Sequence, residues 1–468
     1  MSKLTGWRAF TALWGGQTVS MIGSGLFAFA VGVWVYQRTG SATMFSLILF
    51  FDMMPGILIA PYAGVVADRV NRRTLMLLAN TGCAISSLLV AAIALADVST
   101  GWLWLLYPAL VLGGVSASFH GAAYEASFAL LVEEKHLGRA NGLMQFGYGV
   151  AEVAAPLAAG ILLLYMEIWT LILFDVLTFV VANIALLVLA IPKPATGDGE
   201  DEPTGRLRED LTYGLRFLRG KPGLLMLLLL FAMLNFLASL AVVAVTPLVL
   251  SFGDEAALGT VTALGGAGII VGGLLMTAWG GTRRRIVGLL AATALAGLFL
   301  ALYGVRPSVL LVAVGAFGFF FSLPIINASS GAIWQASVPP AVQGRVFAVR
   351  RILAQASGPV AFIVGGLAID RWLSPLLAEP GGVTDVFGPL FGTGQGRGIG
   401  LLFVAMGALM ILVAAIGAAS PALRGIEHTP AEPTGGAGPT LTEPLPATGP
   451  TILPESARTH PADAAPHA

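Results

Sequence analysis

Apolar residues run along this chain in long blocks separated by short charged or Gly/Pro-rich segments. A helix of about 20 apolar residues spans a bilayer, and the blocks reach that length. Their approximate ranges are 10–35, 42–66, 74–96, 102–131, 139–164, 168–191, 223–250, 257–279, 286–304, 308–336, 345–370 and 398–420. The pattern predicts an all-α membrane protein with twelve transmembrane helices.

Positive charges fall mostly on one side of these predicted helices. Of the 25 Lys and Arg, 21 (25 − 4) lie on the side of the N-terminus, and the other four are Arg38, Arg306, Arg371 and Arg397. Lys and Arg resist translocation across the bilayer. The sequence therefore predicts a multi-pass protein of the cell membrane with both termini in the cytoplasm.

Short signals recur at a nearly constant spacing in the two parts of the chain. Arg72 returns as Arg284 (284 − 72 = 212), and Pro156 returns as Pro359 (359 − 156 = 203). Such a repeat is how a bilobed transporter is built, with a cavity where its halves meet. It predicts two six-helix bundles, at residues 1–191 and 223–420.

Two other segments differ in composition from the bundles. Residues 192–222 begin with an acidic Gly/Pro run and continue with leucines at helical spacing, so we expect a cytoplasmic linker with an amphipathic helix. That helix can pack on the membrane surface or bind a partner. Residues 421–468 are rich in Pro, Ala, Thr and Gly, which predicts a disordered cytoplasmic tail.

Composition excludes several classes of protein. The chain is 56% hydrophobic and 11% charged, with a mean hydropathy of +0.85, which is too apolar for a soluble protein. Its net charge of zero gives no sign of nucleic-acid binding. A single cysteine, Cys83, cannot form a disulfide framework or a cysteine metal cluster. Without a phosphate-binding loop, zinc-ligand spacing or nucleophile triad, we expect no enzyme activity, cofactor or metal, and an ion gradient as the driving force.

The most specific stretch is Gly64-Val-Val-Ala-Asp68-Arg69-Val-Asn-Arg72-Arg73. A carboxylate at the end of a membrane helix is costly unless it is paired, and the adjacent guanidinium groups offer partners. We interpret the stretch as a conformational latch, in a tight turn that Gly64 allows to approach its neighbours. The simpler alternative is an ordinary positive loop with one isolated Asp.

This pattern resembles the cytoplasmic loop motif of the major facilitator superfamily, with Asn71 where that family usually has Gly. Segments 131–141 and 338–346 resemble paired loops of the macrolide-efflux-like branch of drug:proton antiporters, which also contains siderophore exporters. The glycine-rich loop 370–400 is similar to that branch too. The resemblance implies a major facilitator fold and a latch made by Gly64, Asp68, Arg69, Arg72, Arg73, Glu133, Glu134, Arg139 and Arg345.

An antiporter motif is implied by the same resemblance. It falls on Pro156 and Gly160 in the fifth apolar block and on Gly358 and Pro359 in the eleventh. Ala155 and Ala159 stand where the family pattern has glycine, and the fourth block lacks the arginine of other drug:proton antiporters.

Five ionisable residues lie inside the apolar blocks: Glu152, Asp52, Glu125, Asp175 and His120. Such groups are costly in a membrane and are usually functional. Removal from water favours the protonated form of a carboxylate, so these are the candidates for proton coupling, with Glu152 first. Its counterpart in the repeat is Gln355 (355 − 152 = 203), a neutral isostere. The alternative for each carboxylate is a hydrogen bond that packs helices, and for His120 a structural role.

Uncharged polar and aromatic residues supply candidates for a substrate cavity. They are Gln17, Phe27, Trp34, Phe146, Tyr148, Asn235, Phe236, Asn327 and Gln355. Aromatic walls suit a bulky apolar ligand. Aromatic residues of membrane helices also face lipid or pack the bundle.

These observations, together with what the resemblance implies, predict a secondary active transporter that exports bulky amphipathic small molecules, a drug or a secondary metabolite, by proton antiport through alternating access. Its expected partners are a small-molecule substrate, protons and the lipid bilayer, without nucleic acid, and we expect a monomer. A dedicated siderophore or lipid-like carrier is the first alternative. A non-transporting membrane receptor or scaffold is a second, although a scaffold has no need of buried ionisable groups.

Overall fold

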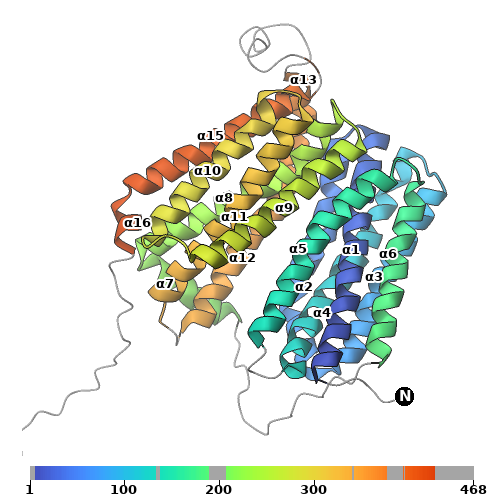
Figure 1. Cartoon of the computed structure of the whole chain (residues 1–468), viewed down its shortest axis with the longest axis horizontal. Coiled ribbons are helices and arrows are strands. Elements are labelled where there is room, and N and C mark those ends of the chain that lie inside the picture. The colour runs from blue at the N-terminus through green and yellow to red at the C-terminus, as the bar shows by residue number, and fades with distance from the viewer. Residues whose placement is uncertain are drawn as a thin grey trace, which may run out of the picture. The chain divides into compact units, whose positions relative to one another are not determined.

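The computed structural model of the chain describes residues 6–132, 137–188, 207–339, 342–376, 394 and 396–426. The described residues form helices joined by short turns (Figure 1). The helices are α1 (Gly6–Thr39), α2 (Ala42–Arg69), α3 (Arg72–Leu95), η1 (Thr100–Leu105), α4 (Leu106–Leu131), α5 (Leu137–Leu162), α6 (Ile168–Val188), α7 (Leu207–Arg219), α8 (Pro222–Leu250), α9 (Glu255–Trp279), α10 (Arg285–Val305), α11 (Val309–Ser337), α12 (Gln343–Ala368), η4 (Ile369–Leu373), α13 (Ser374–Leu376), α15 (Arg397–Ala419) and α16 (Pro421–Gly425).

Eleven of the described helices are long and apolar enough to cross a membrane: α1 to α4, α6, α8 to α12 and α15. The apolar part of α5, Phe146–Leu162, is shorter. Lipid offers no hydrogen bonds to the backbone, so helices that satisfy their own peptide groups are the expected form for such blocks. The all-α membrane fold is confirmed, and the count is consistent with the predicted twelve spans.

Helix pairings repeat between a first half, α1 to α6, and a second half, α8 to α15. In the first half α2 and α3 pack on α4, and α6 packs on α1 and α3. In the second half the corresponding helices α9 and α10 pack on α11, and α15 packs on α8 and α10. The shared order of contacts is consistent with two six-helix bundles and shows that the sequence repeat corresponds to a repeat of helix packing.

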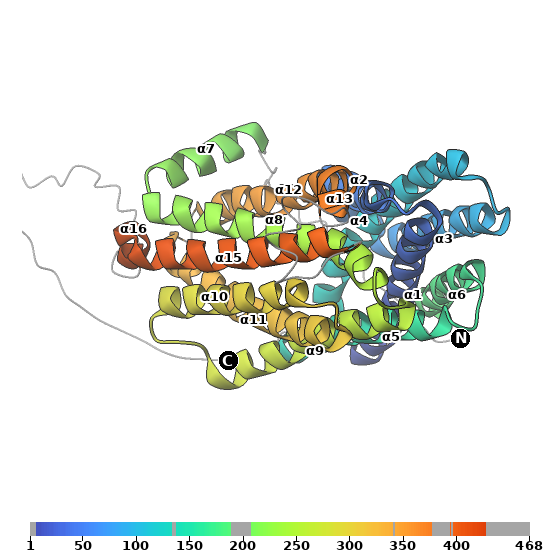
Figure 2. The ribbon, with the colours of Figure 1, turned by 90° about the horizontal axis from the view of Figure 1, so that it is seen from above.

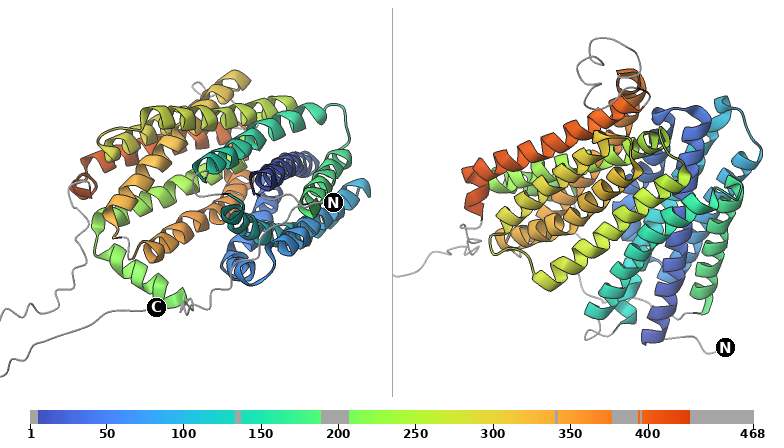
Figure 3. Two further views of the ribbon diagram at one scale, coloured as in Figure 1. Left: turned by 60° about the horizontal axis from the view of Figure 1, so that its bottom comes forward. Right: turned by 45° about the horizontal axis from the view of Figure 1, so that its top comes forward.

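The two halves meet along two helix pairs, α5 with α9 and α2 with α12 (Figures 1 and 3). Small residues allow both contacts. A Cβ atom added at Gly160 of α5 would lie 3.0 Å from the Cα of Gly259 of α9, and one at Gly366 of α12 would lie 2.9 Å from the carbonyl oxygen of Ala42. In membranes, small residues let helix backbones approach closely. Each of the two contacts pairs one helix of the first half with one helix of the second, so the interface between the halves is itself repeated.

The bundle has two ends that differ in charge. The arginine-rich end carries the α2–α3 and α9–α10 turns, with Arg72, Arg73, Arg284 and Arg285. The opposite end carries the α1–α2 and α8–α9 turns. There Gln37 of α1 donates a hydrogen bond to the side chain of Glu255 of α9. Contacts between the halves are found among the described residues from the middle of α2, α5, α9 and α12 to this opposite end.

The amphipathic helix expected between the bundles forms as α7, which packs against α12 and α8 (Figure 2). Of its predicted apolar face, Leu218 is completely buried, whereas Leu215 is 39% exposed. The helix therefore attaches to the second half through a face that includes Gly214 and Leu218.

The prediction of a disordered tail from residue 421 is wrong for its first residues. Residues Pro421–Gly425 form α16, and Leu423 and Ile426 are buried. A Cβ atom at Gly223 of α8 would lie 2.6 Å from the carbonyl oxygen of Ala422, so α16 packs directly on α8. The burial of two apolar side chains beside a glycine holds this turn against α8. The composition of the tail as a whole does not reveal these two residues. Residues 427–468 lie outside the described residues.

Candidate transport site

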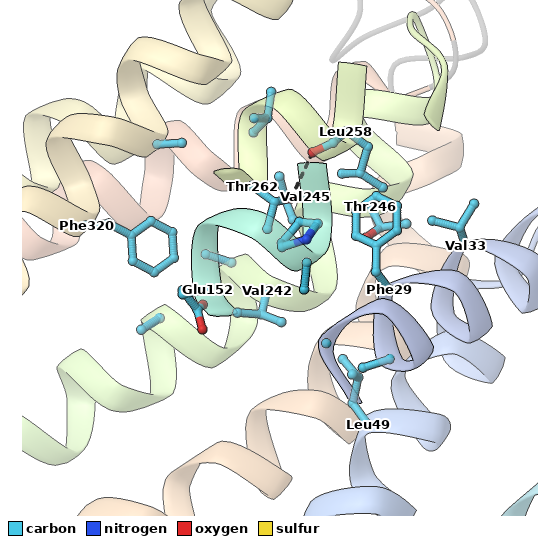
Figure 4. A pocket seen from close by; sticks show the side chains of 18 of the residues that line it. Phe29, Val33, Leu49, Glu152, Val242, Val245, Thr246, Leu258, Thr262 and Phe320 are labelled. Carbon is cyan, nitrogen blue, oxygen red and sulfur yellow. Dashed lines mark hydrogen bonds between the residues drawn. The ribbon is translucent and has the colours of Figure 1, made fainter. Parts of the chain in front are cut away.

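A cavity of about 300 Å³ lies between the two halves. Its walls come from α1, α2 and α5 of the first half and from α8 to α11 of the second (Figure 4). Most of the lining is apolar, and its polar side chains among the described residues are Glu152, Thr246, Thr262 and Tyr303. A largely apolar cavity with few polar groups is typical of sites for small organic molecules.

Small residues create the space, and aromatic residues shape it. The helices on both sides of the cavity carry small residues that fill little volume: Gly25, Ala28, Ala151, Ala155 and Ala238. The aromatic lining is Phe29, Phe45, Tyr303, Phe319 and Phe320. Tyr303 is held in place by stacking on Phe403, with ring centroids 4.7 Å apart.

Glu152 of α5 lines this cavity, and its side chain is exposed there (Figure 4). Its backbone is fixed by α9, since a Cβ atom at Gly266 would lie 2.9 Å from the Glu152 carbonyl oxygen. Among the described residues no side chain forms a hydrogen bond with its carboxylate. A carboxylate placed in this way can take up and release a proton without breaking a structural contact.

The other intramembrane carboxylates differ from Glu152 in their surroundings. Asp175 is buried in the first half and accepts hydrogen bonds from Ser24 Oγ at 3.1 Å and Ser87 Oγ at 2.6 Å. It joins α6 to α1 and α3, which favours the packing role that the sequence left open. Asp52 of α2 and Glu125 of α4 are exposed and lie outside the lining of the cavity.

His120 and Gln17 are polar groups inside the first half. His120 stacks on Tyr124 with ring centroids 5.9 Å apart, and its Nε2 atom is buried without a hydrogen-bond partner among the described residues. The Nε2 atom of Gln17 is also buried without a hydrogen-bond partner among the described residues. Neither side chain lines the cavity.

Most of the aromatic residues chosen from the sequence do not line the cavity. Phe27 is buried in the core of the first half, and Trp34 packs against the same core with Arg38 over its ring at 5.9 Å. Phe146 and Tyr148 are exposed on α5. These four side chains do not line this cavity in the structure, because they lie on other faces of α1 and α5.

The remaining candidates have other environments. Asn235 donates a hydrogen bond to the carbonyl oxygen of Phe231 in its own helix at 2.8 Å, and Phe236 packs against the core of the second half. Asn327 of α11 is exposed. None of the three lines the cavity. The side chain of Gln355 lies outside the described residues.

The antiporter motif falls where the halves meet. Pro156 lines the cavity, and a Cβ atom at Gly259 would lie 2.6 Å from its carbonyl oxygen. Gly160, one turn later, faces Gly259 directly. In α12, Pro359 is buried, and a Cβ atom at Gly358 would lie 3.2 Å from Ser239 Oγ of α8. The motif in α5 therefore forms the crossing with α9, immediately beside Glu152.

At the arginine-rich end, the cations of the expected latch bind helix carbonyl groups. Arg72 Nη1 donates to the carbonyl oxygen of Ala126 at 2.7 Å, and Arg73 donates to those of Leu186 at 2.8 Å and Leu187 at 2.5 Å. Cations near the carbonyl end of a helix are favoured by its dipole. These contacts tie α3 to α4 and α6 within the first half.

The structure describes only some of the other residues of the expected latch. Asn71 caps α3, accepting from the N–H groups of Arg73 and Thr74, and Arg69 is exposed. At Gly64 the described residues make no close approach, because a Cβ atom there would meet none of their atoms within 4 Å. The side chains of Asp68, Glu133, Glu134, Arg139 and Arg345 lie outside the described residues.

Sequence reasoning missed the aromatic residues that do line the cavity, such as Phe29, Phe45 and Phe320. Membrane helices are apolar all round, so periodicity does not distinguish the face toward lipid from the face toward a cavity. The available signal was the set of Gly and Ala residues in α1, α5 and α8, which marks where helices come close or leave space.

Comparisons with known proteins agree with this architecture. The family model of the Major Facilitator Superfamily matches residues 13–363. The chain is 27% identical over 379 residues to macrolide efflux protein A of Streptococcus pyogenes, which covers 79% of this chain and 92% of that protein. It is 27% identical over 218 residues to the enterobactin exporter EntS of Shigella boydii, which covers 46% of this chain and 50% of that protein.

Solved structures share the fold at low sequence identity. A bacterial homolog of the human lysosomal transporter Spinster, in an inward-facing and unoccupied conformation, matches with a TM-score of 0.63 and 18% identity, over 91% of this chain and 98% of that one. The nucleoside transporter NupG matches with a TM-score of 0.65 and 12% identity, over 87% and 98%. These structures share the fold, and the likeness to macrolide efflux protein A supports the macrolide-efflux-like branch. The family match over residues 13–363 establishes that the chain belongs to the Major Facilitator Superfamily.

Proposed function

We propose that this protein exports bulky amphipathic small molecules, a drug or a secondary metabolite, by proton antiport through alternating access. One observation carries the proposal: an apolar, aromatic cavity lies between the two halves, and Glu152 is its carboxylate among the described residues. The cavity supplies a place for an apolar ligand, and the carboxylate supplies a proton site beside it.

Coupling follows if the proton and the substrate compete. The protonated, neutral form of Glu152 is compatible with an apolar cavity. A substrate that binds more tightly when Glu152 is ionised causes the carboxyl group to release its proton. Exchange of one for the other across the membrane then converts a proton gradient into export. The alternative proton sites remain Asp52, Glu125, Asp175 and His120. Of the three carboxylates, Asp175 is the weakest candidate, because it accepts two hydrogen bonds.

The direction of transport rests on charge and on the relatives. The arginine-rich end is proposed to face the cytoplasm of the cell, because Lys and Arg are retained on that side. Contacts between the halves at the opposite end then support a cavity that is closed toward the outside. The relatives named as efflux protein and exporter support outward transport.

The working unit is proposed to be a single chain in the cell membrane, with bundles at residues 1–191 and 223–420, a linker at 192–222 and a tail that begins after α16. Both halves around the cavity belong to the same chain, so the proposed site needs no second copy to complete it. A siderophore is the second candidate substrate, favoured by the likeness to the enterobactin exporter over 218 residues.

The test is a susceptibility and export assay in a host that lacks its own pumps. Cells with and without the protein are exposed to macrolides, other amphipathic drugs and siderophores, in the presence and absence of a protonophore. We expect lower accumulation of at least one amphipathic class, abolished by the protonophore. Export of siderophores alone would favour the dedicated carrier, and specific binding without transport would favour the receptor. Export that persists after the gradient collapses would contradict proton antiport.

A further inference from the structure

A carboxylate of the second half, Asp370, binds the first turn of a helix in the first half. Its Oδ2 atom accepts hydrogen bonds from Ser41 Oγ at 2.7 Å and from the backbone N–H of Thr43 at 2.8 Å. Its Oδ1 atom accepts from the N–H of Ala42 at 2.8 Å. Three short hydrogen bonds therefore join η4, at the end of α12, to the start of α2.

The start of α2 is incomplete without this contact. The first N–H groups of a helix have no partner within the helix, and its dipole favours a negative charge there. Ser41 is the N-cap of α2 and accepts from the N–H of Met44 at 3.1 Å. Asp370 accepts from the N–H groups of Ala42 and Thr43, which the local cap does not reach. The two halves thus share one helix cap.

The backbone near Asp370 brings it into position. The α-helix α12 changes to the π-helical turn η4 (Ile369–Leu373), and such turns are uncommon and occur often at functional positions. One turn earlier, Gly366 lets α12 approach α2, since a Cβ atom there would lie 2.9 Å from the carbonyl oxygen of Ala42. The close crossing and the change of helix type together place the carboxylate over the end of α2.

We propose that Asp370 is a positioning residue of the transport cycle, which holds the cavity closed at the opposite end by capping α2 from the other half. The inference rests on the proposed function, because it requires the halves to separate at this end when the cavity opens there. Separation must break all three hydrogen bonds at once. The Gln37–Glu255 contact at the same end breaks in the same movement.

The consequence is a shift in population. An interaction that exists in one conformation alone biases the equilibrium toward it by its own free energy. Loss of the Asp370 carboxylate should therefore increase the fraction of molecules open at the opposite end, with α2 and α12 still folded. A residue that only stabilised the fold would lower stability without this change.

The experiment measures distances between spin labels in the whole protein in lipid nanodiscs. Cys83 is the only cysteine in the sequence, so Cys83→Ser gives a background for labelling. One pair, Thr100→Cys and Arg306→Cys, joins exposed positions of the two halves at the opposite end. A second pair, Arg8→Cys and Arg283→Cys, joins exposed positions at the arginine-rich end.

In Asp370→Ala we expect the long-distance population of the first pair to rise at least about threefold, and the second pair to move closer together. Ser41→Ala, which removes one of the three hydrogen bonds, should shift the same populations less. Asp254→Ala is the matched control, because Asp254 caps α9 within its own half by accepting from the N–H of Ala257 at 2.8 Å. It should leave both distances unchanged.

Unchanged distances in folded Asp370→Ala would overturn the inference, as would an equal shift in Asp254→Ala. If Asp370→Ala does not fold, unchanged distances in Ser41→Ala overturn it instead. The measurement uses neither substrate nor a proton gradient. A protein that shifts as expected but exports none of the proposed molecules contradicts the proposed function alone, and a proton-driven exporter with unchanged distances contradicts this inference alone.

Discussion

Arg285 Nη1 donates a hydrogen bond to the carbonyl oxygen of Ala332 at 3.0 Å and so ties the start of α10 to α11. Arg72 Nη1 makes the equivalent bond from α3 to Ala126 of α4 at 2.7 Å. The sequence repeat pairs Arg72 with Arg284 (284 − 72 = 212), so the residue that makes the equivalent bond, Arg285, lies one position further along the chain (285 − 72 = 213). The arginine contact is thus present in both halves, although position 281 (68 + 213), where Asp68 would recur, is a glycine.

This relationship predicts that Arg72→Gln and Arg285→Gln each lower thermal stability. A hydrogen bond from a charged group contributes about 1.5–3 kcal/mol, and less where water competes. Arg72 is half-buried and Arg285 is exposed, so the loss should be larger for Arg72. Thermal unfolding of the detergent-solubilised protein measures it. Arg283→Gln, an exposed neighbour, is the control and should not change the Tm, and an equal loss in all three variants would show that general charge is responsible.

Asp68→Asn should insert normally and transport poorly. The change removes the negative charge that the latch offers to the neighbouring arginines, while a similar side-chain volume remains. We expect export to fall about tenfold at equal expression, which corresponds to about 1.4 kcal/mol. Exchange of Asp68 with Arg72 should restore part of the loss if the two side chains pair directly.

The control for this variant is Asp97→Asn at the opposite end. Asp97 pairs with Arg38 at 2.5 Å within the first half, so its loss removes an acidic charge without touching the latch. Efflux near wild type is expected. Wild-type efflux by Asp68→Asn would remove the latch from the mechanism.

Glu152→Gln should separate substrate movement from proton movement. The amide imitates the protonated carboxyl group permanently, so the cavity keeps its shape and loses its proton site. In proteoliposomes we expect substrate–substrate exchange near wild type and a loss of at least about tenfold in transport driven by a pH gradient. The rate of gradient-driven export should also lose its dependence on pH.

Asp175→Asn is the matched control, because Asp175 is held by Ser24 and Ser87 away from the cavity. We expect it to lower stability and to retain coupling to the gradient. Full gradient-driven transport by Glu152→Gln would exclude Glu152 as the proton site, and Asp52 and Glu125 would be tested next.

Gly160→Leu and Gly259→Leu should each impair transport by forcing α5 and α9 apart. A Cβ atom at Gly160 would lie 2.7 Å from the carbonyl oxygen of Glu255, and one at Gly259 would lie 3.0 Å from the Cα of Gly160, so backbone must move. Gly273→Leu in α9 is the control, since a Cβ atom there meets nothing within 4 Å. Export at matched membrane levels measures the effect, and normal export by both crossing variants would show that the contact is not needed.

Truncation of the tail should be tolerated or harmful according to where it begins. Removal of residues 432–468 should leave expression and export near wild type, because the segment has a composition that cannot bury much apolar surface. Removal from Pro421 also deletes Leu423, which is fully buried, and Ile426. Each buried side chain of this size contributes about 1.5–3 kcal/mol, so a lower Tm is expected. Equal stability of the two truncations would contradict a structural role for α16.

The type and order of the helices followed from the sequence, because the length of an apolar block depends on local sequence and a helix satisfies its own backbone hydrogen bonds. The repeat also followed, since residues such as Arg72 and Pro156 recur at turns and kinks that every half requires. The break after residue 420 was placed a few residues early, because Leu423 and Ile426 stabilise α16 through contacts with α8 rather than through local composition.

Only the tertiary structure decided which side chains meet. Phe27 and Phe29 are two positions apart on one apolar helix, yet Phe27 is buried in the first half and Phe29 lines the cavity. Successive residues turn by about 100° around a helix, and an all-apolar surface does not show which direction faces the other half. The sequence ranked Glu152 first among the carboxylates of the apolar blocks but left a packing role open for each of them, and only the structure showed that Ser24 and Ser87 of other helices bind Asp175.

The sequence by itself determined a membrane protein of two related bundles, their order along the chain and Glu152 as the first candidate for a proton site. The tertiary structure decided that Glu152 lines the cavity, that Gly160 faces Gly259, and that Asp370 caps α2 from 329 positions beyond Ser41. The reason is physical. An apolar block enters the lipid because of its own length and composition, whereas a helix cap shared between the halves forms only when folding brings distant segments of the chain together.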